Sequence, residues 1–296
     1  MSEENEPDTP SCCASRGIAE IDTIILTGCG DCAIEEACQK QVAELRDEIL
    51  FRQPESEPYG DCPICLLPLP LDGRQSVREA CCNKIICNGC RYVKQKRESE
   101  QGLEQKCPFC RHPTPTSMEE ASPLIKKRIE ANDPIALCNM GVDYCGEGDY
   151  NSAFEYWTKA AEMGDIHSHY YLSILHRDGL GCAEKNEKME LYHLEVAAIG
   201  GHSKARFTLG FREQNNDIDI YTKIDRSVKH WIIAANLGHF GALDTLKTLC
   251  LEDGWITKED YDAAARAYQA AVDATKSQQR EEAAIVFAYL ERNNMM

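Results

Sequence analysis

Eight cysteines in the first half of the chain have the type and spacing that metal chemistry needs. Along the sequence they form four pairs: Cys62 and Cys65, Cys81 and Cys82, Cys87 and Cys90, and Cys107 and Cys110. Two thiolates with two residues between them can bind one tetrahedral Zn²⁺ from a single tight turn. Three such pairs and the adjacent pair Cys81–Cys82 within one short segment therefore predict two zinc ions.

The rest of the composition favours metal binding over disulfides. The chain opens with an acidic segment that lacks the apolar core of a secretory signal, and no apolar run approaches the roughly 18 residues that span a bilayer. We therefore expect a cytoplasmic or nuclear protein without a membrane segment, in which thiols stay reduced and clustered pairs indicate zinc. The opposite interpretation, eight cysteines buried as small apolar residues, needs surrounding aliphatic side chains that this segment lacks.

The gaps between the pairs predict which pairs share an ion. Fifteen residues separate Cys65 from Cys81, and sixteen separate Cys90 from Cys107. Long gaps after the first and third pairs are typical of a cross-brace, so pairs one and three are expected to bind one zinc and pairs two and four the other. The module spans residues 60–112.

This layout resembles the RING finger, specifically its all-cysteine variant. The usual RING carries a histidine three residues before its fifth ligand, but here that position is Lys84, whose protonated amine cannot bind zinc. Cys82 is the next candidate, which makes the ligands Cys81 and Cys82 adjacent. Asn83 could supply the left-handed residue that such a sharp turn requires, and His112 is the alternative ligand.

The resemblance implies a docking surface and no catalytic residue. RING domains of ubiquitin ligases bind a charged E2 conjugating enzyme and hold its thioester ready for attack, a gain that comes from positioning. The resemblance places this contact on Ile64, on Tyr92 or Val93, on Pro108 and on Arg111. Arginine suits the last position because its planar guanidinium can donate to two partners at once. Ile64 and Pro108 also stabilise zinc turns, so a RING-like interaction module without ligase activity remains the alternative.

A second group of cysteines lies in residues 12–38. It resembles the first half of a MYND-type zinc finger, but Arg16 stands where a cysteine belongs, and the third cysteine pair and the histidine of that finger are absent. A weak third metal site could use four of these residues: Cys13, Cys29, Cys32 and Cys38. The alternative is a degenerate remnant behind an acidic tail, residues 1–11, that we expect to be disordered.

Charge and motifs exclude several function classes. The net charge of −17 argues against a nucleic-acid surface, which needs concentrated lysine and arginine. No Cys-His-Asp arrangement, phosphate loop or paired carboxylate motif stands out, which argues against a self-contained hydrolase or kinase.

The elements that must position the cysteines are mainly helical. Residues 39–52 place apolar residues on one helical face, and Gln53–Pro58 is expected to break that helix and act as a linker. In the linker and short helix of residues 113–131, Ser122 and Pro123 predict an N-cap followed by proline at the first helical position.

From residue 132 onward the sequence repeats. Alanine pairs occur at 160–161, 197–198, 234–235 and 270–271, spaced 37, 37 and 36 residues apart. A glycine follows three residues after each of the first three pairs, at Gly164, Gly201 and Gly238. This is the length of a two-helix repeat unit. The alternative is an alanine-rich helical domain without true repeats.

The repeated residues predict how the units pack. Small residues let two helices approach closely, the glycine ends the second helix of each unit in a left-handed cap, and Trp157, Leu194 and Trp231 fill the seam. Helix starts agree: Asp133-Pro134 is a cap followed by proline, and Thr257 begins a weak capping box.

These repeats resemble the Sel1-like family over residues 132–275. The matching residues are the alanine pairs, the glycines after them, Leu209-Gly210 and the Asp178–Gly181 loop, whereas the third unit departs from the pattern after Gln214. The resemblance implies a right-handed α-solenoid that binds a protein partner. Residues 276–296 are expected to form a helix that caps the last open face.

The fold class that follows is mainly α: a small cross-braced, two-zinc RING-like domain, followed by an α-solenoid of helix-turn-helix repeats. Two functions fit it. Either the solenoid recruits a substrate that the RING presents to an E2, or the two parts form a non-catalytic, zinc-containing interaction scaffold.

Overall fold

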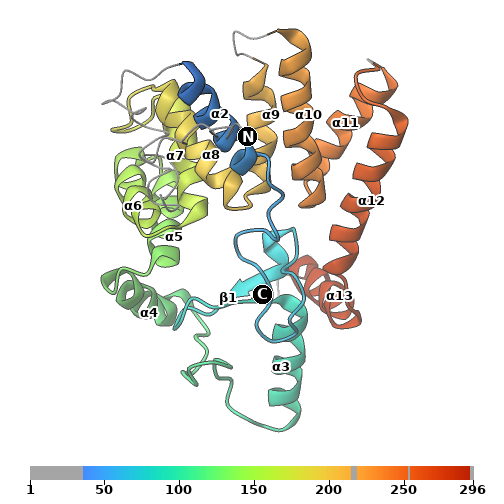
Figure 1. The fold of residues 1–296 in the computed structure, drawn as a ribbon. Coiled ribbons are helices and arrows are strands. Elements are labelled where there is room, and N and C mark those ends of the chain that lie inside the picture. The colour runs from blue at the N-terminus through green and yellow to red at the C-terminus, as the bar shows by residue number, and fades with distance from the viewer. Residues whose placement is uncertain (1–35, 215–218, 253, 294–296) are drawn as a thin grey trace, which may run out of the picture. The chain divides into compact units, whose positions relative to one another are not determined.

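The computed structural model describes residues 36–214, 219–252 and 254–293, and Figure 1 shows their elements. The chain divides into two compact units, Met1–Asp47 and Glu48–Met296, and every contact described below lies within the second. The described residues form twelve α-helices and a single two-stranded sheet. The prediction of a mainly helical protein is therefore confirmed.

The N-terminal cysteine segment falls largely outside this description. Cys13, Cys29 and Cys32 lie outside the described residues, and Cys38 lies in the first turn of α2 (Glu36–Leu50), where only the backbone is described. α2 begins three residues before the helix predicted for residues 39–52 and ends two residues before it.

The cysteine-rich module is built around a small antiparallel sheet. Its elements are η1 (Gly73–Gln75), β1 (Ser76–Arg78), β2 (Ile85–Cys87) and α3 (Asn88–Glu100). Val77 in β1 lies opposite Ile86 in β2, and Ile86 is fully buried. α3 follows β2 without a loop because Cys87 is its N-cap and accepts a hydrogen bond from the N–H of Cys90.

Two turns of the same shape hold the first and the last cysteine pair. In one, the N–H of Leu66 donates to the carbonyl of Cys62 (2.8 Å), and in the other the N–H of Arg111 donates to the carbonyl of Cys107 (3.1 Å). Leu66 and Arg111 both have left-handed backbone, with φ of 58° and 63°. Each turn closes immediately after its second cysteine, so that both sulfur atoms of the pair lie close together.

The start of α4 (Met118–Glu130) corrects a sequence prediction. The N-cap is Ser117 and not Ser122, and Pro123 lies inside the helix. Ser117 accepts from the N–H of Glu120 (3.3 Å), and the Glu120 carboxylate accepts from the N–H of Thr116 (2.8 Å). This capping arrangement satisfies two backbone donors, which favours the earlier start.

The repeats fold into consecutive helical hairpins (Figure 1). Their helices are α5 (Pro134–Gly146), α6 (Tyr150–Glu162), α7 (Ile166–Asp178), α8 (Glu187–Ile199), α9 (Ser203–Glu213), α10 (Ile220–Asn236), α11 (Phe240–Leu251) and α12 (Lys258–Ala274). From α5 to α12, consecutive helices pack against each other, which is the arrangement of a helical solenoid. The predicted caps at Asp133 and Thr257 are confirmed.

One hydrogen bond recurs at the repeat period. The carbonyls of Ala160, Ala197 and Ala234 each accept, at 3.0 Å, from the N–H five residues later. Between each donor and acceptor lies one of the three predicted glycines, and all three have φ between 84° and 90°. The left-handed caps predicted after α6, α8 and α10 are therefore confirmed, and true repeats account for them better than a merely alanine-rich domain.

Tryptophan fills the hairpin seam where glycine makes room for it. The Trp157 Nε1 donates to the carbonyl of Cys138 (3.0 Å), and the Trp231 Nε1 donates to the carbonyl of Phe207 (3.2 Å). Any Cβ atom on Gly210 would overlap the indole of Trp231. The Leu209-Gly210 pair thus allows α9 and α10 to pack directly on each other.

The C-terminal end of the array differs from the prediction. Ala270 is exposed, and the buried alanine of α12 is Ala264. The last helix, α13 (Gln278–Arg292), packs against α3 of the cysteine module (Figure 1). The helix expected over residues 276–296 is therefore present, and its main contact is with the cysteine module. Ala283 of α13 is buried, and Phe287 contacts Tyr92. Capping of the solenoid by this helix stays a prediction.

Candidate metal centre

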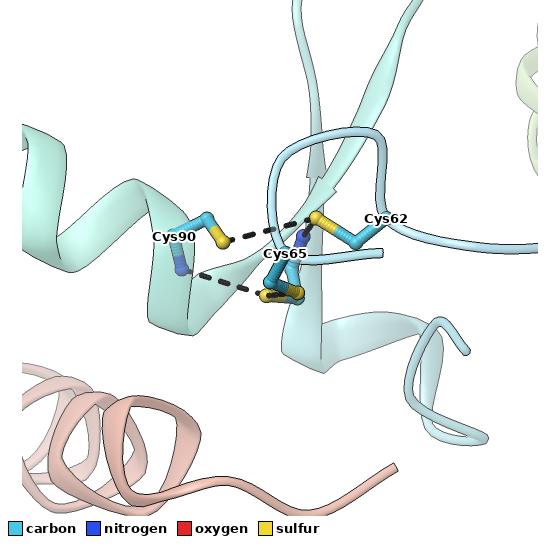
Figure 2. A group of neighbouring side chains, drawn as sticks. Cys62, Cys65 and Cys90 are labelled. Carbon is cyan, nitrogen blue, oxygen red and sulfur yellow. Dashed lines mark hydrogen bonds between the residues drawn. The ribbon is translucent and has the colours of Figure 1, made fainter. Parts of the chain in front are cut away.

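The first group of thiols combines the first and third cysteine pairs. Cys62 and Cys65 come from the first turn, Cys87 ends β2, and Cys90 lies in the first turn of α3. Their sulfur atoms all lie within 4.8 Å of one another, and Figure 2 shows three of the four side chains turned toward a common centre. Buried Ile86 and the start of α3 fix this arrangement.

The sulfur spacing of this group matches tetrahedral coordination. The Sγ atoms of Cys62 and Cys90 are 3.9 Å apart, as are those of Cys65 and Cys87. A tetrahedron with Zn–S bonds of about 2.3 Å has sulfur–sulfur edges of about 3.8 Å. The residues therefore fit a zinc ion bound by four thiolates.

Backbone donors stabilise the thiolate form in this group. The N–H of Cys87 donates to the sulfur of Cys62 (3.5 Å), and the N–H of Cys90 donates to the sulfur of Cys87 (3.4 Å). Burial alone would raise the pKa of the Cys62 thiol, but backbone hydrogen bonds from Cys65, Cys87 and Ile64 lower that pKa to about 7. Such donors favour the ionised ligand that a metal requires.

The second group combines the second and fourth pairs, Cys81 and Cys82 with Cys107 and Cys110. The sulfur atoms of Cys82 and Cys107 are 3.7 Å apart, and those of Cys81 and Cys110 are 3.2 Å apart. This group lies nearer the surface, because Cys110 is exposed. It too presents four thiols within reach of one tetrahedral ion.

A tight turn brings the adjacent cysteines to one centre. The N–H groups of Cys82 and Asn83 both donate to the carbonyl of Glu79, at 3.2 and 2.8 Å. Asn83 is buried and has φ of 57°, the left-handed conformation expected from the sequence. Lys84, in the position of the usual RING histidine, places its ammonium over the ring of Phe109 at 4.8 Å.

The alternative ligand His112 lies outside both groups. Its ring nitrogen Nδ1 is 2.9 Å from the carbonyl of Pro113, and the side chain is exposed. The structure therefore brings together the eight thiols and leaves this imidazole out. Zinc itself stays a prediction that the donor set fits.

Arg280 contacts the first thiol group from the other end of the sequence. Its guanidinium donates to the sulfur of Cys65 (3.4 Å) and to the carbonyls of Leu67 (3.3 Å) and Pro68 (2.7 Å). The side chain is 8% exposed. A buried cation offsets the negative charge of a centre with four thiolates. Nothing in the local sequence distinguishes this arginine from a surface residue of a capping helix.

Close approach of α13 to α3 positions Arg280. A Cβ atom on Gly89 would lie 2.9 Å from the backbone nitrogen of Arg280, so the helices meet at a residue without a side chain. Farther along, Phe287 meets the ring of Tyr92 edge-on at 6.5 Å, and the Arg91 guanidinium lies 5.4 Å from the Phe287 centroid.

The residues that the RING resemblance assigned to E2 docking fall into two classes. Ile64 is 43% exposed and Val93 is 38% exposed, while Arg111 is exposed and Pro108 is half-buried. Tyr92 differs, since it is half-buried beneath Phe287. Of the two alternatives after the sixth ligand, Val93 is the one on the open surface.

Solved structures similar to this chain include two helical repeat proteins. No protein-family model matches the chain. A Sel1 repeat protein from Oxalobacter formigenes is 22% identical, over 60% of this chain and 70% of that protein, with a TM-score of 0.45. A protective antigen of uropathogenic Escherichia coli strains, which displays an SLR fold, is 20% identical, over 68% of this chain and 41% of that protein, with a TM-score of 0.42. The solenoid assignment therefore rests on the recurring hairpins of the chain itself.

The arrangement limits what the metal sites can do. Each group supplies four thiols, which fills a tetrahedral zinc ion and leaves no position for water or substrate. Such an ion would stabilise structure and perform no hydrolysis.

Among the described residues, no helix is long and apolar enough to cross a membrane.

Proposed function

We propose that this chain is a zinc-containing protein-interaction scaffold. The observation that carries the proposal is the closed nature of both thiol groups, each of which has its full set of four ligands. Zinc would then hold residues 60–112 in shape, as it does in small structural fingers. The helical hairpins and the resemblance of their repeats to the Sel1-like family support binding of a protein partner.

The contact between α13 and α3 supports a joint function for the cysteine module and the C-terminal helix. Because Arg280 inserts beside Cys65, the cysteine module and the C-terminal helix are packed as one body. A scaffold gains from such packing, since rigid surfaces lose less conformational entropy when a partner binds. Each binding surface of the scaffold would then present its partner with a fixed arrangement of side chains.

A RING-type ubiquitin ligase is the second candidate. It is favoured by the exposure of Ile64, Val93 and Arg111, which leaves the residues of the inferred E2 contact open. In this function the Arg111 guanidinium would hydrogen-bond both the E2 and the bound ubiquitin, and the metal would only shape the surface.

Reconstituted ubiquitin transfer separates the two functions. The zinc-loaded chain is incubated with E1, ubiquitin and a panel of E2 enzymes, and conjugates are followed on gels. A scaffold forms no conjugates with any E2. Conjugates that are lost in Arg111→Ala but kept in Arg74→Ala, an exposed arginine paired only with Asp72, would establish the ligase instead.

A further inference from the structure

The segment between α2 and the cysteine module is bound along the solenoid. Leu50 is 2% exposed and packs among the buried residues of α8 and α9. Phe51 lies against α10, Ser56 against the turn before α9, and Tyr59 against α7. Residues 50–59, which we call the tethered segment, begin with the last residue of α2 and cross two successive repeats, α7–α8 and α9–α10, although their proline and glutamate content is typical of a linker.

A buried arginine donates a hydrogen bond to the main chain at the start of the tethered segment. Arg206 is fully buried in α9, and its Nη1 donates to the carbonyl of Leu50. Its Nη2 donates to the carbonyl of Ala198 (2.9 Å), at the end of α8. The same guanidinium therefore joins two helices of the solenoid to the C-terminal carbonyl of α2, where the tethered segment begins.

One imidazole and two cationic side chains of α10 surround the aromatic ring of the segment. The Phe51 centroid lies 4.7 Å from that of His230, 4.9 Å from the Arg226 guanidinium and 5.6 Å from the Lys229 ammonium. Such contacts attract the negative face of the ring and select an aromatic residue at this position.

Polar contacts continue toward the C-terminal side of the segment. Gln53 accepts from the Asn236 amide (3.0 Å). Burial raises the pKa of the Glu57 carboxyl, and the neighbouring Ser203 and Lys204 offset part of that rise. Ser203 is the first residue of α9, so this carboxylate lies at a helix N-terminus, which favours negative charge. Tyr59 then stacks on His167, with 4.0 Å between ring centroids.

The repeat glycine makes room for the passing main chain. A Cβ atom on Gly201 would overlap the carbonyl oxygen of Ser56, so only glycine permits this approach. Gly201 is therefore required twice: its backbone forms the left-handed cap after α8, and its missing side chain lets the main chain of Ser56 approach.

We propose that the tethered segment is an internal ligand of the solenoid's peptide-binding face. The external partner of this face is then a peptide with an adjacent leucine–phenylalanine pair and a glutamate farther along, which must displace the segment to bind. The proposal rests on the scaffold function and names the chemistry of its partner.

Peptide competition tests this proposal. A fluorescein-labelled peptide of residues 48–60 is titrated by anisotropy into the zinc-loaded full chain and into its Phe51→Ala and Lys204→Glu variants. In the unmodified chain the segment competes from the same molecule at an effective concentration in the millimolar range. We expect at least tenfold tighter peptide binding by Phe51→Ala. Lys204→Glu should instead release residues 55–59 to faster hydrogen exchange.

Controls make each outcome decisive. Lys188→Glu changes an exposed lysine of α8 and should leave exchange of residues 55–59 unchanged. Equal peptide affinity of the unmodified and Phe51→Ala chains, or no release of the segment in either variant, overturns the proposal. The proposal is also overturned if the segment is released and the surface of the solenoid that it covered binds no peptide. Ubiquitin transfer by the chain would overturn the scaffold function and leave these results unaffected.

Discussion

Arg280 in the last helix donates a hydrogen bond from its guanidinium to the sulfur of Cys65, across 3.4 Å and 215 positions of sequence. The contact connects the predicted zinc centre to the C-terminal end of the chain. Three further donations, to the carbonyls of Leu67, Pro68 and Thr275, partner the two terminal nitrogens of this almost fully buried guanidinium. Metal binding and the packing of α13 are therefore expected to depend on each other.

Removing the Arg280 guanidinium should weaken the first zinc site selectively. Arg280→Met leaves the carbonyl of Pro68 without its guanidinium donor and removes a compensating charge, at a cost of about 2–3 kcal/mol. We expect zinc to leave the first group faster in a chelator competition assay, with release from the second group unchanged. Arg74→Met, at an exposed arginine, is the control. Identical release kinetics in both variants would contradict the coupling.

Chelation should separate the cysteine module from the solenoid. Structural zinc contributes about 10–16 kcal/mol of apparent binding energy in small fingers, which a module with so few buried aliphatic residues needs. With zinc removed, we expect residues 60–112 and α13 to lose hydrogen-exchange protection while α5–α10 keep theirs. The same chain with zinc bound is the reference. Full protection of α3 after complete metal removal would show that the thiol groups are not structural zinc sites.

The sequence predicted those features that depend on local spacing. The cross-brace grouping follows from gaps between cysteine pairs, and the left-handed turn at Asn83 follows from the adjacency of Cys81 and Cys82. The repeat period revealed the alanine seams and the glycine caps, because every unit repeats the same contact. Each of these features is encoded within about 40 residues.

Features that depend on contacts between residues far apart in the chain could not be predicted from the sequence. Arg280 looks like any exposed helical arginine until α13 is known to lie against α3. Residues 50–59 carry proline and glutamate, which are typical of a solvated linker, yet their binding site is built by α7, α9 and α10. The start of α4 was missed for another reason: two serines offered caps, and the reciprocal bonds of Glu120 favoured the earlier one.

The fit of Trp231 against Gly210 predicts an asymmetric response to added methyl groups. Gly210→Ala places a Cβ atom into the indole, which overpacks the hairpin and should destabilise the solenoid by about 1–3 kcal/mol in urea unfolding. Gly146→Ala, at the end of α5 with open space around it, should instead be neutral or stabilise by up to about 1 kcal/mol. Equal effects of the two substitutions would mean that the α9–α10 seam is loosely packed.

A histidine cap should make the solenoid sensitive to acid. His202 is the N-cap of α9, and its Nδ1 accepts from the N–H of Ala205 (3.2 Å), which requires an unprotonated nitrogen. Burial, together with the neighbouring His167 and Lys204, lowers the pKa of His202 to about 3 from its usual 6.5. The folded chain thus binds this proton less readily than the unfolded chain does. Its stability is full above pH 6.5 and declines as the pH falls toward 3, by at most about 1.4 kcal/mol per pH unit.

His202→Asn tests this dependence because asparagine caps helices well and does not titrate. We expect the free energy of unfolding of the variant to fall less steeply between pH 6.5 and 5 than that of the unmodified chain, measured by urea denaturation. His112→Asn, at an exposed histidine, should leave the profile unchanged. Loss of zinc at low pH affects all three chains alike, so the difference between their profiles isolates the cap. Parallel profiles for His202→Asn and the unmodified chain would show that His202 binds its proton equally well in the folded and the unfolded chain, which contradicts a pKa lowered by folding.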